Sequence, residues 1–427
     1  MSRVAIVGAG LSGAVLAIHA LREGAEQVTL IEREYAPGRG VAYSTTRPEH
    51  LLNVPARRMS VYPDDPEHFA RRFGDAEDYA ERRQFGDYLA GLLAESGAQV
   101  VRDEAVAVEH GESGEWVRLA GGGAVEADSV VLALGNLKPA TPPGIRPQTL
   151  GRVYVEDPWF GGIAEGLGER ETVLLVGTGL TAVDAALTLD AEGFRGQILA
   201  LSRRGLKPRS NLKREPVGTP PDAVATGCSR LLRAVRGRAR RVGWREAVYE
   251  VRQRVQAIWS GATLDERRRF LRHLRPWWDV HRHRLAPAVA ERIEAMEAAG
   301  RLRLVAGRLV SAGRSASGAA VRWRPRGKDE VETLEVARIV NCTGPELDIA
   351  RAAEPLLDAL IAAGRIRPDP CRLGIDVDWD GRALDSEGQA SDTLWAIGPM
   401  TRGAYWETVA VSDIAVQAQR VARLLAA

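Results

Sequence analysis

The sequence predicts an α/β protein with two doubly wound parallel sheets, the second inserted into the first. Two glycine-rich turns, at residues 8–13 and 177–182, each stand between an apolar strand-like run and a helix-compatible run. Strand-like runs also return late in the chain, after the second unit is complete. We therefore expect a first domain built from residues 1–150 and 335–427, and a second domain over 151–334 with a helical insertion at 222–300.

The first 150 residues alternate strand-like and helix-like runs. A strand at 4–7, a glycine turn, a helix at 13–23 and a strand at 28–32 form one βαβ unit. The other elements expected here are a turn-rich loop over 36–65, helices near 66–73 and 82–95, strands at 101–108, 116–119 and 129–135, and a proline-containing linker at 139–147.

The pattern restarts about 170 residues after the first glycine turn. A strand at 172–176, a helix at 181–191 and a strand at 197–202 form a second βαβ unit. Residues 222–300 have helical periodicity with few breakers. The remaining expected elements are strands at 303–311, 318–324, 337–341 and 393–397, and an amphipathic helix over roughly 408–425.

Length and composition indicate a folded chain of more than one domain. The chain has 427 residues, of which 45% are hydrophobic and 27% charged, so it exceeds the size at which one core keeps growing. Cys228, Cys342 and Cys371 lie too far apart for a Cys-x-x-Cys pair or a zinc cluster. The chain opens on a strand, and no apolar run is long enough to span a membrane. We therefore expect a cytoplasmic protein with no membrane span.

The first glycine motif is Gly8-Ala9-Gly10-Leu11-Ser12-Gly13. Its glycines permit the tight turn, the approach of a pyrophosphate and the contact of helix with strand, as in a Rossmann-like dinucleotide site. Glu32 ends the next strand, where its carboxylate can accept hydrogen bonds from a ribose hydroxyl. The positions expected to contact this nucleotide in the first part of the chain are Gly8, Gly10, Leu11, Ser12, Gly13, Glu32, Arg33, Gly40 and Gly135.

The second motif is Gly177-Thr178-Gly179-Leu180-Thr181-Ala182, with alanine as the third small residue. Its second strand ends in Arg203 and Arg204 instead of an acid. A guanidinium binds a 2′-phosphate that an acid would repel, which favours NADPH over NADH; the alternative is a solvated strand end. The positions expected to contact NADPH are Gly177, Gly179, Leu180, Thr181, Ala182, Arg203 and Arg204.

The order of these features resembles that of flavoproteins with two dinucleotide domains, which include flavin-containing and Baeyer–Villiger monooxygenases, ornithine and lysine N-hydroxylases, and disulfide reductases. Residues 133–136 and 341–344 look like their two crossover turns, and 395–399 like the late strand that carries FAD. The resemblance implies FAD at the first motif and NADPH at the second. Three segments, at 40–45, 50–56 and 398–407, are also similar to a bacterial family of FAD-NAD(P)-binding proteins, most of which have no assigned reaction.

Three chemistries remain open for such a pair of cofactors. The flavin can use O2 to hydroxylate a substrate, pass electrons to another acceptor as a reductase or dehydrogenase, or serve in a sensor protein. The missing Cys-x-x-Cys motif excludes a disulfide reductase of the usual kind. We favour a monooxygenase that acts on a small polar molecule, such as a nitrogen-containing one; the resemblance to N-hydroxylases and an arginine-rich lobe motivate this expectation.

Two segments hold candidate catalytic residues. Asn53, followed by Val54, lies on a loop that could reach the flavin, although an asparagine there could equally form a turn. Trp406, Glu407 and Thr408 precede the last helix, whose N-terminus points at the flavin in similar proteins; ordinary capping and aromatic packing are the alternative. Gly398 and Pro399 complete the positions expected to contact FAD.

Residues 229–284 carry sixteen arginines, five acids and no lysine. The run Trp277–His283 could relay protons, but packing at the surface of a lobe is the more ordinary explanation. The arginines could serve an anionic substrate, an acidic partner or the NADPH phosphates. No recognised motif accompanies them, so we expect no nucleic-acid partner; a small-molecule substrate and O2 are the expected partners, with no metal.

Overall fold

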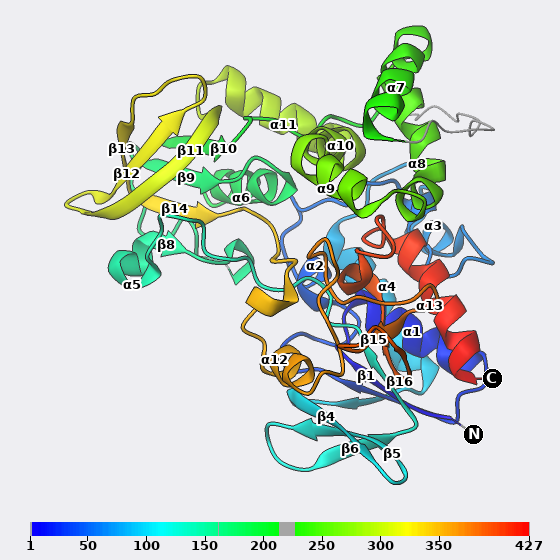
Figure 1. Cartoon of the computed structure of the whole chain (residues 1–427). Helices are drawn as coiled ribbons and strands as arrows, with labels where there is room; N and C mark the ends of the chain where they lie inside the picture. The colour runs from blue at the N-terminus through cyan, green and yellow to red at the C-terminus, as the bar shows by residue number, and fades with distance from the viewer. Residues whose placement is uncertain (1, 161, 213–226, 427) are drawn as a thin grey trace.

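The computed structural model describes residues 2–160, 162–212 and 227–426. It confirms the α/β class. Two large sheets form two bodies: the sheet of the first glycine motif lies in the lower part of Figure 1, and that of the second motif lies above it. Residues 222–226 of the expected helical insertion lie outside the described ranges.

The first sheet is six-stranded, in the order β15-β16-β7-β1-β2-β3. Its strands are β1 (Arg3–Val7), β2 (Gln27–Ile31), β3 (Gln99–Val101), β7 (Ser129–Leu132), β15 (Arg382–Leu384) and β16 (Ala390–Ala396). The strands β16, β7, β1, β2 and β3 run parallel, with Ala5 opposite Thr29 and Val130. Segments from both ends of the sequence therefore build this sheet.

Alternate side chains of β1 enter two different cores, as a strand covered on both faces requires. Val4 and Ile6 pack with α1 (Leu11–Arg22), α4 (Arg82–Ser96) and α13 (Val411–Ala426). Ala5 and Val7 pack on the other face with α12 (Pro355–Ala362) and a three-stranded sheet. That small sheet contains β4 (Ala105–Gly111), β5 (Gly114–Leu119) and β6 (Ala124–Ala127).

The expected single strand over 101–108 is wrong. It is divided between β3 of the large sheet and β4 of the small one, and the chain turns at Asp103, whose carboxylate accepts from the backbone of Glu104 and Gly121. Short helices α2 (Gly40–Tyr43) and α3 (His68–Phe73) lie within and after the expected turn-rich loop.

The second sheet has seven strands in the order β13-β12-β11-β10-β9-β14-β8. They are β8 (Tyr154–Val155), β9 (Thr172–Val176), β10 (Gln197–Ser202), β11 (Leu302–Ser315), β12 (Gly318–Pro325), β13 (Glu332–Val336) and β14 (Arg338–Asn341). β8, β14, β9, β10 and β11 are parallel, and β12 and β13 extend the sheet antiparallel. A short α5 (Pro147–Leu150) precedes β8.

Two of the expected domain limits need correction. β14 pairs with β9 and β8, so the second domain extends through residue 341 and does not end at 334. α11 (Pro287–Ala298) buries Val289, Ala290 and Ile293 in the core that α6 (Leu180–Ala191) shares with this sheet. It is therefore a helix of the domain itself, because its apolar face fits between α6 and β11.

The remaining helices form what we call the helical lobe, residues 228–282. It comprises α7 (Cys228–Val242), α8 (Trp244–Ser260), α9 (Leu264–His273) and α10 (Arg275–Arg282). Figure 1 shows the lobe in green above the start of α13, in red. The lobe thus belongs to the second domain in sequence but lies against the first.

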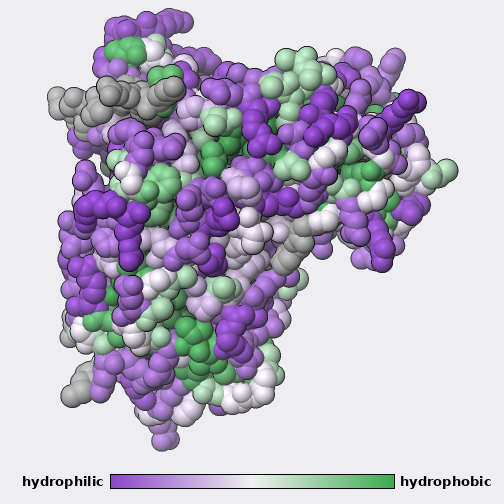
Figure 2. Space-filling model, turned by 180° about the vertical axis from the view of Figure 1, so that it is seen from behind, coloured by the Kyte–Doolittle hydropathy of each residue, from purple (hydrophilic) through white to green (hydrophobic). Residues whose placement is uncertain are grey.

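The chain crosses from the first domain to the second after Leu137 and returns after Asn341. The two crossings are tied together, because Asn341 Nδ2 donates to the carbonyl of Ala140 at 3.1 Å and Glu346 N donates to that of Lys138 at 3.3 Å. On the face in Figure 2, hydrophilic side chains dominate and hydrophobic ones form small scattered groups. None of the described helices is both long and apolar enough to cross a membrane.

Candidate functional site

The first glycine motif makes the turn between β1 and α1. Gly8 has a φ of 101°, and a Cβ atom there would overlap the carbonyl oxygen of Ala133 on the neighbouring crossover. A Cβ on Gly13 would overlap the carbonyl of Gly8, so both positions require glycine. α1 begins after Gly10 with no side-chain cap and no acid in its first turn. Its first amides therefore remain available to a bound anion.

Glu32 is buried at the end of β2 and organises this turn. Its Oε2 accepts from Ala9 N at 2.9 Å, and its Oε1 accepts from Glu34 N at 2.9 Å and Tyr35 N at 3.0 Å. A carboxylate oxygen has two lone-pair directions, so Oε2 can still accept one hydroxyl donor from a ligand.

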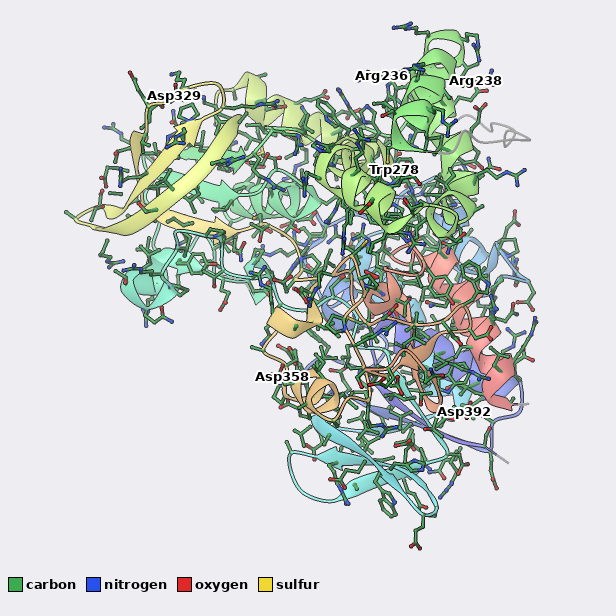
Figure 3. All side chains as sticks on the ribbon, in the orientation of Figure 1. Arg236, Arg238, Trp278, Asp329, Asp358 and Asp392 are labelled. Carbon is green, nitrogen blue, oxygen red and sulfur yellow. The ribbon has the colours of Figure 1, made fainter. Side chains whose placement is uncertain are left out.

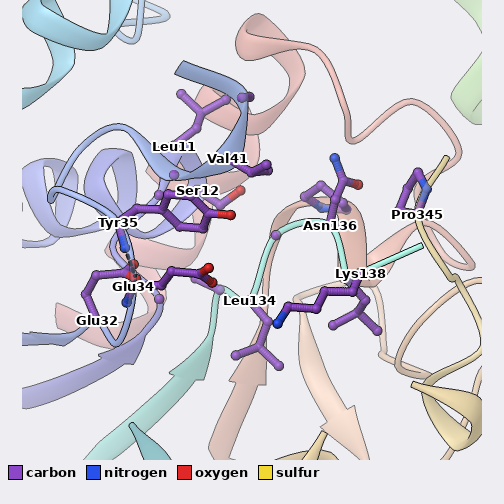
Figure 4. Close-up of a pocket in the computed structure, with 18 of the residues that line it drawn as sticks. Leu11, Ser12, Glu32, Glu34, Tyr35, Val41, Leu134, Asn136, Lys138 and Pro345 are labelled. Carbon is purple, nitrogen blue, oxygen red and sulfur yellow. Dashed lines mark hydrogen bonds between the residues drawn. The ribbon is translucent and has the colours of Figure 1, made fainter. Parts of the chain in front are cut away.

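These residues line a cavity of about 350 Å³, shown in Figure 4. Ten predicted positions line it: Gly8, Gly10, Leu11, Ser12, Glu32, Arg33, Gly40, Gly135, Thr181 and Pro399. Figure 4 shows Glu34 and Tyr35 on one side and Asn136 and Lys138, which follow β7, on the other. Thr181 belongs to the second glycine motif, so the cavity extends from one motif to the other.

Arg33 lines the cavity but is already engaged. Its guanidinium donates to Glu104 at 2.8 Å and to Glu354 at 2.8 and 3.0 Å. The hydrogen bonds to Glu354 raise the pKa of Arg33 above its usual range despite partial burial. Arg33 therefore joins β2 to the segment before α12 and closes one wall of the cavity.

Several lining residues were not predicted from the sequence. Arg82, at the start of α4, pairs with Asp184 of α6 at 2.8 Å, and its guanidinium lies 5.4 Å from the ring centre of Trp159. These contacts join the two domains beside the cavity. Arg82 and Trp159 are remote in sequence from both glycine motifs, so no local pattern could have identified them. Lys138 directly follows the crossover turn at 133–136, and that position could have identified it.

The second glycine motif repeats the geometry of the first. Gly177 has a φ of 132° and faces the carbonyl of Cys342 with no room for a Cβ, whereas the Cβ position of Gly179 has no atom within 4 Å. α6 begins after Gly179 without a side-chain cap. Leu180 and Ala182 pack into the core behind the turn. The motif therefore leaves open space and free amides in front of Gly179.

The two arginines after β10 differ in their surroundings. Arg203 is exposed, and none of the residues that the structure describes accepts a hydrogen bond from it. Arg204 is half-buried, and its Nη2 donates to the carbonyl of Arg272 at 3.4 Å. Of the two, Arg203 is the freer cation.

The structure does not bring the predicted catalytic residues into the cavity. The carbonyl of Asn53 accepts from Asn211 Nδ2 at 2.9 Å, and Val54 packs against the core of the first domain. Trp406 is fully buried against Trp259 of the lobe, with ring centres 4.7 Å apart.

Glu407 and Thr408 also point elsewhere. Glu407 pairs with Arg282 of the lobe at 2.8 Å, and Thr408 Oγ1 donates to the carbonyl of Tyr405 at 3.0 Å. Gly398 lies directly against Ser12, and its amide donates to Gln417 Oε1 at 2.9 Å. The segment 398–413, which we call the C-terminal segment, therefore borders the cavity through Pro399 and Val409 and contacts the lobe through Trp406 and Glu407.

No described group of histidine, cysteine, aspartate or glutamate side chains could hold a metal ion. The three cysteines are free, with Cys342 buried and the other two half-buried.

Comparisons with known proteins identify the class of fold. A family model described as FAD-NAD(P)-binding matches residues 5–137. No curated protein matches the sequence.

Solved structures match along the whole chain. L-lysine 6-monooxygenase from Pseudomonas syringae is similar with a TM-score of 0.71 and 16% identity, covering 100% of this chain and 99% of that one. The ornithine N-hydroxylase of Kutzneria sp. 744, solved with reduced FAD, NADP+ and L-ornithine, gives 0.67 and 18%, covering 99% and 98%. A thioredoxin reductase from Lactococcus lactis gives 0.58 and 13%, covering 100% and 99%. The chain thus has the two-domain fold of the flavin-dependent N-hydroxylases.

Proposed function

We propose that the protein is an FAD- and NADPH-dependent monooxygenase that uses O2 to hydroxylate a small polar substrate, one containing nitrogen. The observation that carries this proposal is the cavity lined by Gly10 and Ser12 of the first motif and by Thr181 of the second. Hydride transfer requires the reactive ends of the two nucleotides to meet, and a cavity that reaches both motifs permits this.

The cavity fits FAD at the first motif. The uncapped start of α1 offers amides to a pyrophosphate, the buried Glu32 offers an acceptor to a ribose hydroxyl, and the Cβ position of Gly135 is open. The match of residues 5–137 to an FAD-NAD(P)-binding family model supports the same assignment.

The second motif fits NADPH. The space in front of Gly179 and the uncapped start of α6 suit a second pyrophosphate. The exposed guanidinium of Arg203 is available for a 2′-phosphate.

The fold of the N-hydroxylases supports a nitrogen-containing substrate, since the lysine and ornithine enzymes match over the full chain. Reduced FAD supplies the activation of O2 in this chemistry. The residues of this chain bind both nucleotides, exclude water and hold the substrate. The burial of Trp406 and Glu407 indicates that they position the C-terminal segment against the lobe.

Oxygen uptake and product analysis test the reaction. The purified protein should be yellow and contain FAD. It should consume NADPH and O2 in equal amounts and form an oxygenated amine or amino acid as the product. Hydrogen peroxide formed in place of an oxygenated product for every candidate amine would contradict the monooxygenase assignment.

A reductase is the second candidate, because a thioredoxin reductase has the same fold. Turnover with NADPH and a quinone under nitrogen would favour it. The described structure gives no support for dithiol chemistry, since its three cysteines are unpaired.

A further inference from the structure

Charged side chains from distant parts of the sequence converge where the helical lobe meets the C-terminal segment. The lobe contributes Arg252 from α8 and Arg275, Asp279 and Arg282 from α10. The C-terminal segment contributes Arg402, Glu407 and Asp413. Trp278, marked in Figure 3, lies in the lobe beside this cluster and donates its Nε1 to Glu407 at 3.0 Å.

Three of the four arginines have an acidic partner. Arg282 pairs with Glu407 at 2.8 Å, Arg252 with Asp413 at 2.7 Å, and Arg275 with Asp279 at 3.4 Å.

Arg402 is the exception. No residue within the described ranges forms a hydrogen bond or an ion pair with its guanidinium, which lies 4.5 Å from the ring centre of Trp406. Burial, with Arg275 adding to it, lowers the pKa of Arg402 to about 10. Asp279 and Glu407 lie near enough to offset part of this lowering, but neither bonds to the guanidinium, and a cation taken out of water without a bonded partner is costly.

Two neighbouring groups are also unsatisfied. Arg402 Nε, Trp406 Nε1 and Asp279 Oδ1 are all buried without a hydrogen-bond partner among the described residues. Eleven such atoms occur among the described residues, and three of them belong to this one cluster; a bound ion or water is a common reason for such groups. Two of the three atoms are donors that can serve an anion.

The backbone around Arg402 is held in place from both sides. Gln417 of α13 accepts from Gly398 N and donates to Thr401 Oγ1 at 3.0 Å, while Trp259 Nε1 of the lobe donates to the carbonyl of Gly403 at 2.7 Å. A Cβ on Gly403 would overlap the carboxyl of Asp369. Arg402 is therefore presented by a fixed segment, as a binding residue must be.

Arg402 also lies next to the proposed flavin cavity in the chain. Pro399 and Val409, which precede and follow it, line that cavity. Arg402 itself does not line the cavity, so an anion bound there would lie at the boundary between the lobe and the first domain, three residues along the chain from the cavity wall at Pro399.

We propose that Arg402 is the anion-binding residue of the substrate site and that the substrate carries a carboxylate. This inference rests on the proposed function, since it names the substrate class of that enzyme. A carboxylate suits the site better than a phosphate, because Asp279 and Glu407 would repel a dianion more strongly than a single charge. The planar guanidinium can bind a carboxylate through two parallel hydrogen bonds. The Trp406 ring on which it lies stabilises the cation by a cation–π contact.

Paired probes test the inference on the FAD-containing protein. Three carboxylates, acetate, succinate and benzoate, and their amides, acetamide, succinamide and benzamide, are each titrated into the protein. Tryptophan fluorescence measures binding, and the Trp406–Trp259 stack makes this signal sensitive to the site. At least one carboxylate should bind about 10-fold or more tightly than its amide, the range expected for hydrogen bonds to a charged group. Equal binding within all three pairs, or no binding of any carboxylate, would overturn the proposal.

Variants identify the residue responsible. Arg402→Gln should bring the carboxylate-to-amide ratio close to 1, whereas Arg402→Lys should retain part of it. Arg420→Gln, which removes an exposed arginine paired with Asp380, is the matched control and should leave the ratio unchanged. A ratio in Arg402→Gln equal to that of the wild type would overturn the proposal.

The same samples separate this inference from the proposed function. FAD content and the rate of flavin reduction by NADPH report on the proposed function, and the control Arg420→Gln should leave both unchanged. A wild-type protein that contains no FAD would contradict the proposed function, while its carboxylate-to-amide ratio would still decide the role of Arg402.

Discussion

A side chain at position 10 would block the proposed FAD site, because Gly10 lies at its pyrophosphate-binding turn. It is the last residue before α1 and faces Gly40 of α2, so a side chain here would enter the space between two backbones. Gly10→Val should abolish FAD retention, because the added side chain excludes a pyrophosphate from the helix start. The ratio of flavin to protein absorbance after purification measures this.

Gly91→Val is the control for that substitution, because the Cβ position of Gly91 in α4 is free of neighbours. It should retain FAD. A normal flavin content in Gly10→Val would remove this turn from the FAD site.

Arg203 and Arg204 should contribute unequally to coenzyme preference. Arg203 is exposed and free of partners within the described structure, whereas Arg204 already donates to Arg272. We expect Arg203→Ala to reduce the preference for NADPH over NADH by roughly 10- to 100-fold, since each hydrogen bond between charged groups contributes about 1.5–3 kcal/mol. Arg204→Ala should cost less, and the double variant should lose most of the preference. Steady-state kcat/KM with both coenzymes decides; unchanged ratios in the double variant would refute the assignment.

The sequence predicts residues of the cavity only where they follow local geometry. Gly8, Gly10 and Glu32 were predictable because a strand, a tight turn and a helix fix their relative positions within one βαβ unit. Arg82 reaches the cavity only because the two domains pack together. Nothing in its own neighbourhood in the sequence reports that packing. Arg402 lies in the segment 398–407, which the sequence analysis singled out. Its role as an unpaired cation depends on which arginines of the lobe have acidic partners, and the sequence does not show this.

At the scale of elements, α10 and the C-terminal segment form a buried contact centred on Glu407. Burial opposes ionisation of this carboxyl, but Arg282, His283 and Arg252 outweigh that cost and hold its pKa below the usual range. Its side chain is only 6% exposed. Ion pairs at such a position are not screened by water, in contrast to the many exposed pairs of this protein.

Glu407→Gln should therefore destabilise the protein by about 3–5 kcal/mol at neutral pH, because it leaves Arg282 buried without its counter-charge. A depressed folded pKa stabilises the fold above the ordinary glutamate pKa of about 4.3. The difference between wild type and variant should thus be complete at neutral pH and shrink as the pH falls below that value. Urea unfolding across this pH range measures it.

Glu109→Gln serves as the control, since Glu109 pairs with Arg118 at the surface. It should change the unfolding free energy by about 1 kcal/mol or less. A difference for Glu407→Gln that does not depend on pH would contradict the role assigned to the ion pair.

Hydrophobic periodicity predicts a helix but not the neighbour on which it packs. The helical pattern over 222–300 does not distinguish the four helices of the lobe from α11, because each of these helices has one apolar face. The partner of that face decides: α11 packs on α6 and β11, whereas α10 packs towards the C-terminal segment. β14 likewise joined the second sheet because it lies beside β9, a pairing between residues that are distant in sequence.

In the molecule as a whole, the order of the two glycine motifs along the chain was sufficient to predict the two-domain arrangement.

The three cysteines bear on the redox chemistry of the protein. Cys342 is buried, burial raises the pKa of all three thiols, and none is paired. Cys228→Ser together with Cys371→Ser should leave NADPH oxidation and O2 uptake within about 2-fold of wild type, since thiol chemistry needs an accessible thiolate. Loss of turnover in this double variant would point to a dithiol reductase.

The chain passes between the two domains at the two tied crossings, so a rotation of one domain against the other would turn about them. These two connecting segments are hydrogen-bonded to each other through Asn341 and Glu346, and they would let the domains turn about a single line. The Arg82–Asp184 pair and the Arg282–Glu407 pair both join the domains away from that line. Rotation would have to break both, so the described contacts brace the hinge. X-ray scattering profiles with and without NADP+ should therefore superimpose, and a ligand would then have to enter and leave without a change in the shape of the molecule.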